Sequence, residues 1–134
     1  MSYNNTFKTL FDKTYELVKR KVRDIRFPCY GVHFYRYALL TYTEYVHFYL
    51  TPTSLIYTAS SVYLTEIPFA QIKKLSIKQG KVFKSSYTIR LVADKKYHFL
   101  INSYKNFSTD LTGDSAENVR NFIETLQANV DNNT

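Results

Sequence analysis

The chain has few of the residues that cross-link or punctuate a protein: one cysteine, three glycines, three prolines and no tryptophan among 134 residues. Cys29 cannot form an internal disulfide, which fits a reducing compartment. Three glycines make a phosphate-cradling loop hard to build, and the glycine-rich nucleotide-binding motifs are absent from the sequence. No apolar run approaches the ~20 residues of a membrane span, and none follows Met1. We therefore expect a cytoplasmic protein without a secretory signal.

Apolar and aromatic residues are abundant. Apolar residues make up 45% of the chain, and 13 Tyr and 10 Phe give an aromatic share of 17%. A chain of this length and composition can bury a core as one domain, without a disulfide or a metal. Tyrosine favours half-buried sheet faces, where its ring packs and its hydroxyl stays in water. These numbers indicate one domain with tyrosine-rich sheet faces.

The net charge of +7 is unevenly distributed. Residues 1–27 carry seven bases and three acids, and residues 71–98 carry eight bases and one acid. Residues 99–134 carry two bases and five acids. Two basic regions and an acidic end indicate attraction to an anionic partner or surface, or charge complementarity within the molecule.

The residues before Pro28 are typical of an amphipathic helix, which we expect from Asn5 to Arg26. Apolar side chains recur with a helical period, and a proline drives the residue before it out of the helical region. The candidate interaction residues of this helix are Phe7, Leu10, Phe11, Leu17 and Val18. The helix docks this stripe on its own domain or on a second copy, or it lies on an anionic membrane with Arg20 and Arg23. We favour docking, because a stripe of this size needs a cover.

Short runs of β-branched and aromatic residues alternate with polar ones between Tyr45 and Ile101, and turn signals recur there roughly every 8–12 residues. We expect about seven antiparallel strands. The first is Gly31–Thr43, and it connects through Thr43–Glu44–Tyr45 to the second. The residues of the second strand that should face the core are Val46, Phe48 and Leu50.

Three later turns divide the rest of the sheet. Pro52 presets the turn Thr51–Ser54, glycine supplies a positive φ at Gln79–Gly80, and Asp94–Lys95 reverses the chain again. The strands expected around these turns are Leu55–Ser60, Val62–Ile67, Gln71–Lys78, Lys81–Val92 and Lys96–Ile101.

A second amphipathic helix is expected from Asp114 to Gln127. Asp114 and Glu117 are typical of a capping box, and one apolar stripe follows. A twisted sheet of this size tends to curl, and this stripe can plug it. The predicted fold is mainly β: a partly open barrel of about seven antiparallel strands, capped by a C-terminal helix, with an extra N-terminal helix. The expected divisions are residues 1–27 for the first helix, 28–129 for the barrel and 130–134 for a disordered tail.

Local motifs accompany this order of elements, namely YLTPTSLIYT, EIPFAQIKKLSI, YTIRLVADKKYHFLI and AENVRNFIETL. Over residues 36–127 they resemble the bacterial pleckstrin-homology (PH) and GRAM-like families. The resemblance implies a PH-like binding module. Because some bacterial members form symmetric assemblies, it also implies a homo-oligomer. Lipid-binding members place basic residues at the first strand-to-strand connection, whereas Thr43–Glu44–Tyr45 contains none, so a phosphoinositide pocket of that kind is not implied.

No pattern of catalytic or metal-binding residues is present in the sequence. We expect His33, His47 and His98 on strand surfaces, since none has a cysteine or carboxylate companion in a ligand or catalytic pattern. Cys29 has no CxxC companion and is expected to be a packed thiol. The sequence therefore predicts no enzyme, no metal and no cofactor.

The remaining candidate site is a set of basic residues on three successive strands and their turns. Its members are Lys73, Lys74, Lys78, Lys81, Lys84, Arg90, Lys95 and Lys96. They form one patch or two. They either bind an anionic headgroup or protect the edge of the sheet and keep it in solution.

Three functions compete. The first is a non-enzymatic PH-like scaffold that binds a protein or a second copy of itself. The second is a peripheral membrane module that binds anionic lipid through Arg20, Arg23, Lys73 and Lys74. The third is single-stranded nucleic-acid binding, and the residues that motivate it are Tyr35, Tyr37, Tyr45 and Tyr49. A half-wet sheet face explains these tyrosines better, so nucleic acid is the least supported partner.

Overall fold

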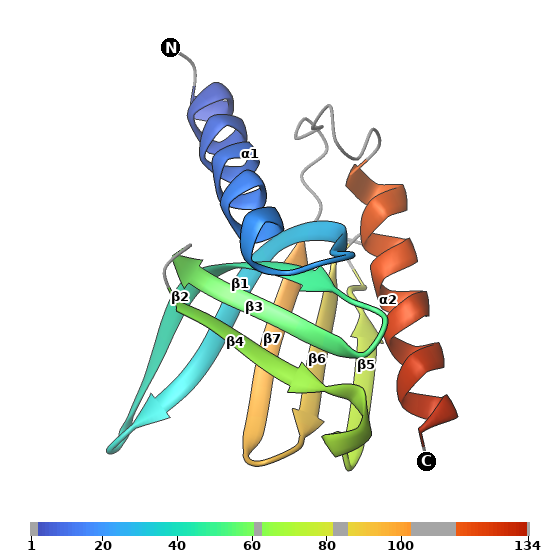
Figure 1. The fold of residues 1–134 in the computed structure, drawn as a ribbon. Helices are drawn as coiled ribbons and strands as arrows, with labels where there is room; N and C mark the ends of the chain where they lie inside the picture. The colour runs from blue at the N-terminus through green and yellow to red at the C-terminus, as the bar shows by residue number, and fades with distance from the viewer. Residues whose placement is uncertain (1–2, 61–62, 82–85, 103–114, 134) are drawn as a thin grey trace.

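Seven antiparallel strands of the described chain form one continuous sheet (Figure 1). The computed structural model describes residues 3–60, 63–81, 86–102 and 115–133. The strands are β1 (Arg26–Tyr37), β2 (Leu40–Leu50), β3 (Ser54–Ser60), β4 (Tyr63–Pro68), β5 (Lys74–Gln79), β6 (Tyr87–Val92) and β7 (Lys96–Asn102). Their order across the sheet is β4-β3-β2-β1-β7-β6-β5, so β1 joins the first strands of the chain to the last.

The sheet curls into a partly open barrel, and helix α2 (Ser115–Asn132) lies along its opening. It contacts β1, β5 and a short 3-10 helix, η1 (Phe69–Gln71). Phe122 and Leu126 of α2 are fully buried in the core. The rings of Phe122 and Phe48 lie 6.2 Å apart, edge to face. This architecture confirms the predicted mainly β, partly open barrel with a capping C-terminal helix.

Helix α1 (Tyr3–Lys21) packs on the outer face of the sheet. Val18 is fully buried against Tyr49 and Ile56, and the ring of Phe11 stacks on His47 with centroids 5.4 Å apart. Tyr49 and His47 alternate along β2 with core residues, so they point to the side that α1 covers. Among the alternatives for α1, the structure therefore shows docking on its own domain.

Helix α1 ends at Lys21, earlier than the predicted end at Arg26. Asp24 adopts a left-handed conformation with φ 58°, which turns the chain back toward the sheet. Val22 and Ile25 still pack against the cluster beneath α1 after the chain has left the helix. The apolar period in the sequence therefore extends beyond the helix itself.

The first hairpin turns at Ala38–Leu39, so the prediction of one strand over Gly31–Thr43 with a connection at Thr43–Glu44–Tyr45 is wrong. Ala38 has φ 58°, and neither turn residue is one of the types that mark tight hairpins. The predicted core face of the second strand is confirmed. Its buried core members are Val46, Phe48 and Leu50.

The connection between β5 and β6 is also longer than predicted. Gln79 pairs with Tyr87, and the N–H of Gly80 donates to the carbonyl of Ser86 at 2.8 Å. The predicted strand Lys81–Val92 therefore starts too early, and residues 82–85 lie outside the described chain.

The turns at Thr51–Ser54 and Asp94–Lys95 are confirmed. Strand β5 begins at Lys74 instead of Gln71, because η1 precedes it.

Helix α2 runs past its predicted end at Gln127 to Asn132. Val130 is 4% exposed and belongs to the core, which holds the last turn against the barrel. The predicted tail from residue 130 is therefore wrong for residues 130–132. The expected cap at Asp114 lies outside the described residues.

Candidate functional site

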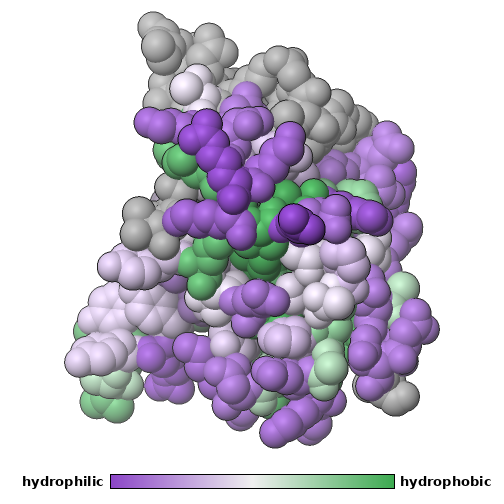
Figure 2. Space-filling view, viewed as in Figure 1, coloured by the Kyte–Doolittle hydropathy of each residue, from purple (hydrophilic) through white to green (hydrophobic). Residues whose placement is uncertain are grey.

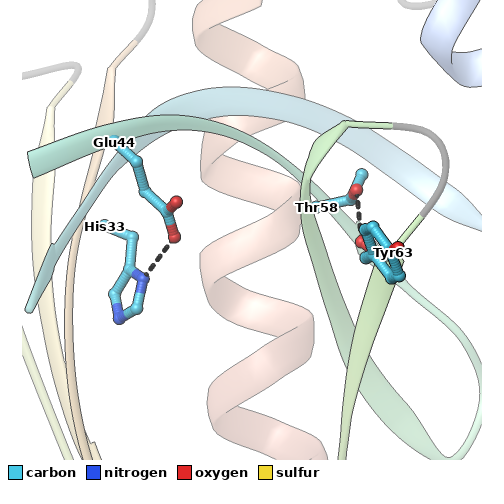
Figure 3. Close-up of polar contacts among 4 residues, drawn as sticks. All are labelled: His33, Glu44, Thr58 and Tyr63. Atoms are coloured by element: carbon cyan, nitrogen blue, oxygen red, sulfur yellow. Dashed lines mark hydrogen bonds and ion pairs between the residues drawn. The ribbon is translucent and has the colours of Figure 1, made fainter.

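His33 lies on the inner side of β1 and contacts a carboxylate that is distant in the sequence. Its Nδ1 is 2.9 Å from Oε1 of Glu44, the opposite residue on β2 (Figure 3). The ring is buried among aromatic side chains, and the ring centroids of Tyr57 and Phe99 each lie 5.2 Å away. The expectation of a surface histidine without a carboxylate partner is wrong, because strand pairing brings the two residues together.

His47 is buried as well, because α1 covers the outer face of β2. Burial lowers the pKa of its imidazole to about 4, so the ring is neutral at neutral pH. Its Nδ1 has no hydrogen-bond partner, and Phe11 and Tyr30 contact its ring. This environment suits packing and excludes the proton exchange with solvent that acid–base catalysis needs.

Cys29 is a packed thiol, as expected. It lies in the core, and burial raises the pKa of the thiol. The side-chain amide of Asn118 lies 3.5 Å from its sulfur. A buried thiol with a raised pKa is a poor nucleophile.

The structure indicates no metal site among the residues that it describes: no three His, Cys, Asp or Glu side chains gather there. The described helices also include none that is both long and apolar enough to cross a membrane.

Basic side chains gather on the outer face of β5, β6, β7 and β1, where the register aligns two rows. The first row contains Ser76, Arg90, His98 and Phe34. The second row contains Lys74, Val92 and Lys96. Arg36 lies two residues after Phe34 on β1, and Lys96 lies two residues before His98 on β7. Because Phe34 pairs with His98 and the strands are antiparallel, Arg36 comes level with Lys96 and extends the second row.

These rows line a hollow of about 920 Å³. We call it the basic hollow, and its cations are Arg36, Lys74, Arg90, Lys95 and Lys96. Its surface also includes the rings of Phe34 and His98, whose centroids are 4.7 Å apart. No described residue that lines the hollow carries a carboxylate. The arrangement combines two adjacent aromatic rings, tilted by 34° to each other, with concentrated positive charge.

Within the part of the chain that the structure describes, no salt bridge joins a cation of the basic hollow to a carboxylate. One acid lies nearby, Asp94, the neighbour of Lys95 in the chain: the hydrogen bond from Tyr97 lowers the pKa of its carboxyl, and the charge of Lys95 adds to the effect. Lys95 also places its Nζ 5.3 Å from the ring centroid of Tyr97. Burial, and then the positive charge of Arg90, lower the pKa of His98, and His33 adds to the effect. His98 is therefore neutral at neutral pH, and the lysines and arginines carry the charge. Such a site can attract and hold an anion.

The sequence-predicted basic residues separate into two groups. Lys74, Arg90, Lys95 and Lys96 line the basic hollow, and Lys73 is exposed just before β5 at the same end of the sheet. Lys78 and Lys81 lie near the other end, where β5 turns toward β6. Lys84 lies outside the described residues. The cluster is thus two patches, and only one of them has a hollow.

Arg36 was missing from the predicted set. The sequence placed it inside a strand, whereas it lies one residue before the end of β1 and beside the hollow. Arg20 and Arg23 are exposed in α1 and in the connection that follows it, and neither lines the hollow. Knowing the position of the first turn would have placed Arg36 near a strand end. The sequence does not reveal that position, because Ala38 and Leu39 are not turn-forming residues.

The candidate interaction residues of α1 also separate. Phe11 and Val18 are buried against the domain itself, and Leu17 is half-buried. Leu10 is 55% exposed. Phe7 lies in α1, but its side chain lies outside the described part of the chain. The four tyrosines proposed for base stacking differ in exposure: Tyr49 is fully buried under α1, whereas Tyr35, Tyr37 and Tyr45 are exposed.

The β1–β2 hairpin projects from the barrel and carries exposed apolar residues at its tip (Figure 1). We call Tyr37, Leu39 and Leu40 the hairpin tip; they are 74%, 90% and 61% exposed. Figure 2 shows hydrophobic surface at this lower left corner of the molecule, next to pale surface of intermediate hydropathy. The hairpin tip and the basic hollow meet at Arg36.

No protein-family model matches the chain, and no curated protein matches it. Among solved structures, the chain is similar to the C-terminal domain of an unknown protein from Leishmania infantum. That structure has 13% sequence identity and a TM-score of 0.48, and the match covers 92% of this chain and 97% of the other.

Proposed function

We propose that this chain is a non-enzymatic, PH-like binding module that holds an anionic, phosphate-type group in the basic hollow. The observation that carries this proposal is the set of five cations around one concave surface, where no described lining residue is an acid and no salt bridge neutralises a cation. Cations that gather at a concave surface raise the local potential and concentrate anions. The cytoplasm is the expected location, where the anionic groups of lipid headgroups are available.

The two kinds of cation have different tasks in this proposal. The guanidinium groups of Arg36 and Arg90 can each donate two parallel hydrogen bonds to phosphate oxygens. Lys74, Lys95 and Lys96 act as point charges at the rim. A hydrogen bond to a charged group contributes about 1.5–3 kcal/mol, so removing both arginines should weaken binding measurably.

The contents of the hollow support binding rather than catalysis. Ser76 and Thr41 are the aliphatic hydroxyls that line it, and neither is hydrogen-bonded to a histidine or a carboxylate in the described chain. A hydroxyl nucleophile needs such a base for activation. We therefore expect ligand binding without turnover.

Self-assembly through the N-terminal helix has less support than the sequence suggested. Two of its five candidate residues, Phe11 and Val18, are buried against the same chain, whereas Leu17 is half-buried and Leu10 is exposed. A protein partner or a second copy remains a prediction for other surfaces, and light scattering on the purified chain tests it.

Calorimetric titration with myo-inositol hexakisphosphate and with inorganic phosphate, at low salt, tests the proposal. We expect the double variant Arg36→Gln/Arg90→Gln to bind the inositol phosphate at least about tenfold more weakly than the natural chain. The matched control Lys78→Gln/Lys81→Gln removes the same charge at the other end of β5 and should change affinity less than about twofold. Equal losses in both variants, or no binding by the natural chain at low salt, would contradict a site in the hollow.

A further inference from the structure

We infer that the hairpin tip enters a lipid bilayer while the basic hollow and its neighbouring cations hold anionic headgroups at the surface. This inference rests on the proposed anion site. It adds the source of the anion, a membrane, and the element of the chain that anchors it. It is carried by the placement of the apolar hairpin tip and the cations of the basic hollow at one end of the barrel.

The side chains of the hairpin tip are exposed and lie outside the core. The turn between β1 and β2 consists of Ala38 and Leu39, so the chain reverses at the extreme end of a projecting ribbon (Figure 1). Leu39, the most exposed large apolar residue of the described chain, is 90% exposed. Beside it the exposed Tyr37 and Leu40 pair across the strands. Leucine favours the hydrocarbon, and tyrosine favours the headgroup boundary.

The strand register brings the cations to the same end as the tip. The end of β1 lies beside the start of β7, because Phe34 pairs with His98 in antiparallel strands. The start of β5 reaches this end as well, since Lys74 pairs with Val92 and Val92 with Lys96. The exposed cations gathered around this end are Arg36, Lys73, Lys74, Lys95 and Lys96. Asp94, in the β6–β7 turn, accepts a hydrogen bond from the hydroxyl of Tyr97 at 2.8 Å.

A bilayer fits this surface better than a folded protein partner. Stable protein interfaces bury about 800 Å² on each partner and need matching shapes. The hairpin tip offers only three large apolar side chains, at and beside a two-residue turn. A fluid bilayer requires no matching shape. Stable membrane anchoring takes two signals, such as an apolar insertion and a basic patch, and this end of the barrel presents both. The uneven positive charge complements an anionic leaflet.

Because the chain contains no tryptophan, a single introduced tryptophan reports its own environment. We would compare Leu39→Trp at the tip with Leu10→Trp, which is also exposed. Leu10 belongs to α1, a helix that lies away from the hairpin tip (Figure 1). The vesicles contain phosphatidylcholine and phosphatidylserine in a ratio of about four to one, with phosphatidylcholine alone as control. We expect a blue shift and quenching by brominated lipid for Leu39→Trp on anionic vesicles, and neither change for Leu10→Trp.

A second variant separates insertion from headgroup binding. Leu39→Ser/Leu40→Ser alters exposed side chains only, so the fold should persist, and circular dichroism checks it. We expect vesicle affinity to fall at least about tenfold while binding of myo-inositol hexakisphosphate changes less than about twofold. A blue shift at Leu10→Trp alone, or vesicle binding without a change at Leu39→Trp, would overturn the inference. A blue shift of Leu39→Trp that grows with protein concentration without vesicles would indicate a second copy instead.

The two proposals fail in different ways. Loss of the anion site shows as absent binding of myo-inositol hexakisphosphate by the natural chain. If that binding is present and depends on Arg36 and Arg90, but Leu39→Trp stays in water on every vesicle, only the membrane inference is wrong.

Discussion

The side-chain amide of Asn118 in α2 donates a hydrogen bond to the backbone carbonyl of Pro28, 2.7 Å away and 90 residues earlier in the chain. Both groups are buried, and the bond joins the closing helix to the start of β1. Two residues after Pro28, at Tyr30, β1 pairs with both β2 and β7. One polar contact thus fixes the helix against the strand that unites both halves of the sheet.

Replacing Asn118 with alanine should destabilise the fold by about 1–3 kcal/mol, because the buried carbonyl of Pro28 loses its donor. The control is Gln127→Ala, which removes an exposed hydrogen bond to Asp131 in the same helix. That change should cost less than about 0.5 kcal/mol. Urea unfolding followed by circular dichroism measures both, and equal costs would show that the Asn118 bond carries no special weight.

Gly31 should not tolerate a side chain. A Cβ at this position would overlap the carbonyl oxygen of Leu100 on β7 and lie 3.0 Å from Cε2 of Phe48. Because the obstacle is backbone, the strands must separate, and we expect Gly31→Ala to cost about 1–3 kcal/mol. Thermal unfolding provides the measurement. A variant as stable as the natural chain would mean that β1 and β7 pair less closely than described.

Docking of α1 should depend on Val18. The side chain is fully buried between Tyr49 and Ile56, so Val18→Ala removes two methyl groups and should cost roughly 2 kcal/mol. Leu10→Ala, on the exposed part of the same helix, should cost less than about 0.5 kcal/mol. Limited proteolysis of the connection after Lys21 gives a local readout, and cleavage should accelerate only in the Val18 variant.

Stability should fall as the pH falls from 7 to 5, with His47 responsible for part of the loss. The pKa of His47 is about 4 in the folded chain because the ring is buried, against about 6.5 when unfolded. The unfolded state therefore binds the proton first, and the stabilisation present above pH 6.5 is lost as the pH approaches 4. Between pH 7 and 5 the loss should reach about 1–2 kcal/mol.

The pH slope, rather than the stability at a single pH, is the readout for His47. Urea unfolding of the natural chain and of His47→Gln at both pH values removes any packing cost from the comparison. We expect a smaller slope in the variant. Identical slopes would show that His47 does not titrate differently in the two states.

Cys29 should be inert toward thiol reagents in the folded protein. The side chain is buried and burial raises its pKa, so almost no thiolate is available at pH 8. In denaturant the single thiol should react completely. Rapid labelling of the native protein with a disulfide reagent would indicate that the region near Pro28 opens readily.

The fold was more predictable than the site, and the first hairpin shows why. Apolar alternation identified the core residues Val46 and Phe48, because a period of two is independent of where the strand begins. The turn itself was missed, since Ala38 and Leu39 have no turn propensity and adopt their conformation through the pairing on either side. Because the turn was misplaced, Arg36 was predicted to lie in the middle of a strand rather than near the end of β1.

The histidines illustrate the same limit. His33 and His47 alternate with other residues on strands, and a sequence cannot tell which face a neighbouring element covers. Glu44 faces His33 only because β1 and β2 pair in one register, and α1 buries His47 only because it docks on that side of the sheet. Burial of a strand residue depends on partners that are distant in the chain.

The sequence by itself determined the mainly β character, the two amphipathic helices and the excess of positive charge, since these follow from local periodicity and composition. Tertiary structure decided which charges act together. Strand order placed β1 beside β7, so Arg36 joined Arg90 and Lys96 around one hollow, while Lys78 remained at the far end. It also left the hairpin tip uncovered, while α1 packed on the outer face of β2 and β3 and α2 packed against β1 and β5. Proximity across a sheet depends on register, and register is set by packing of the whole barrel.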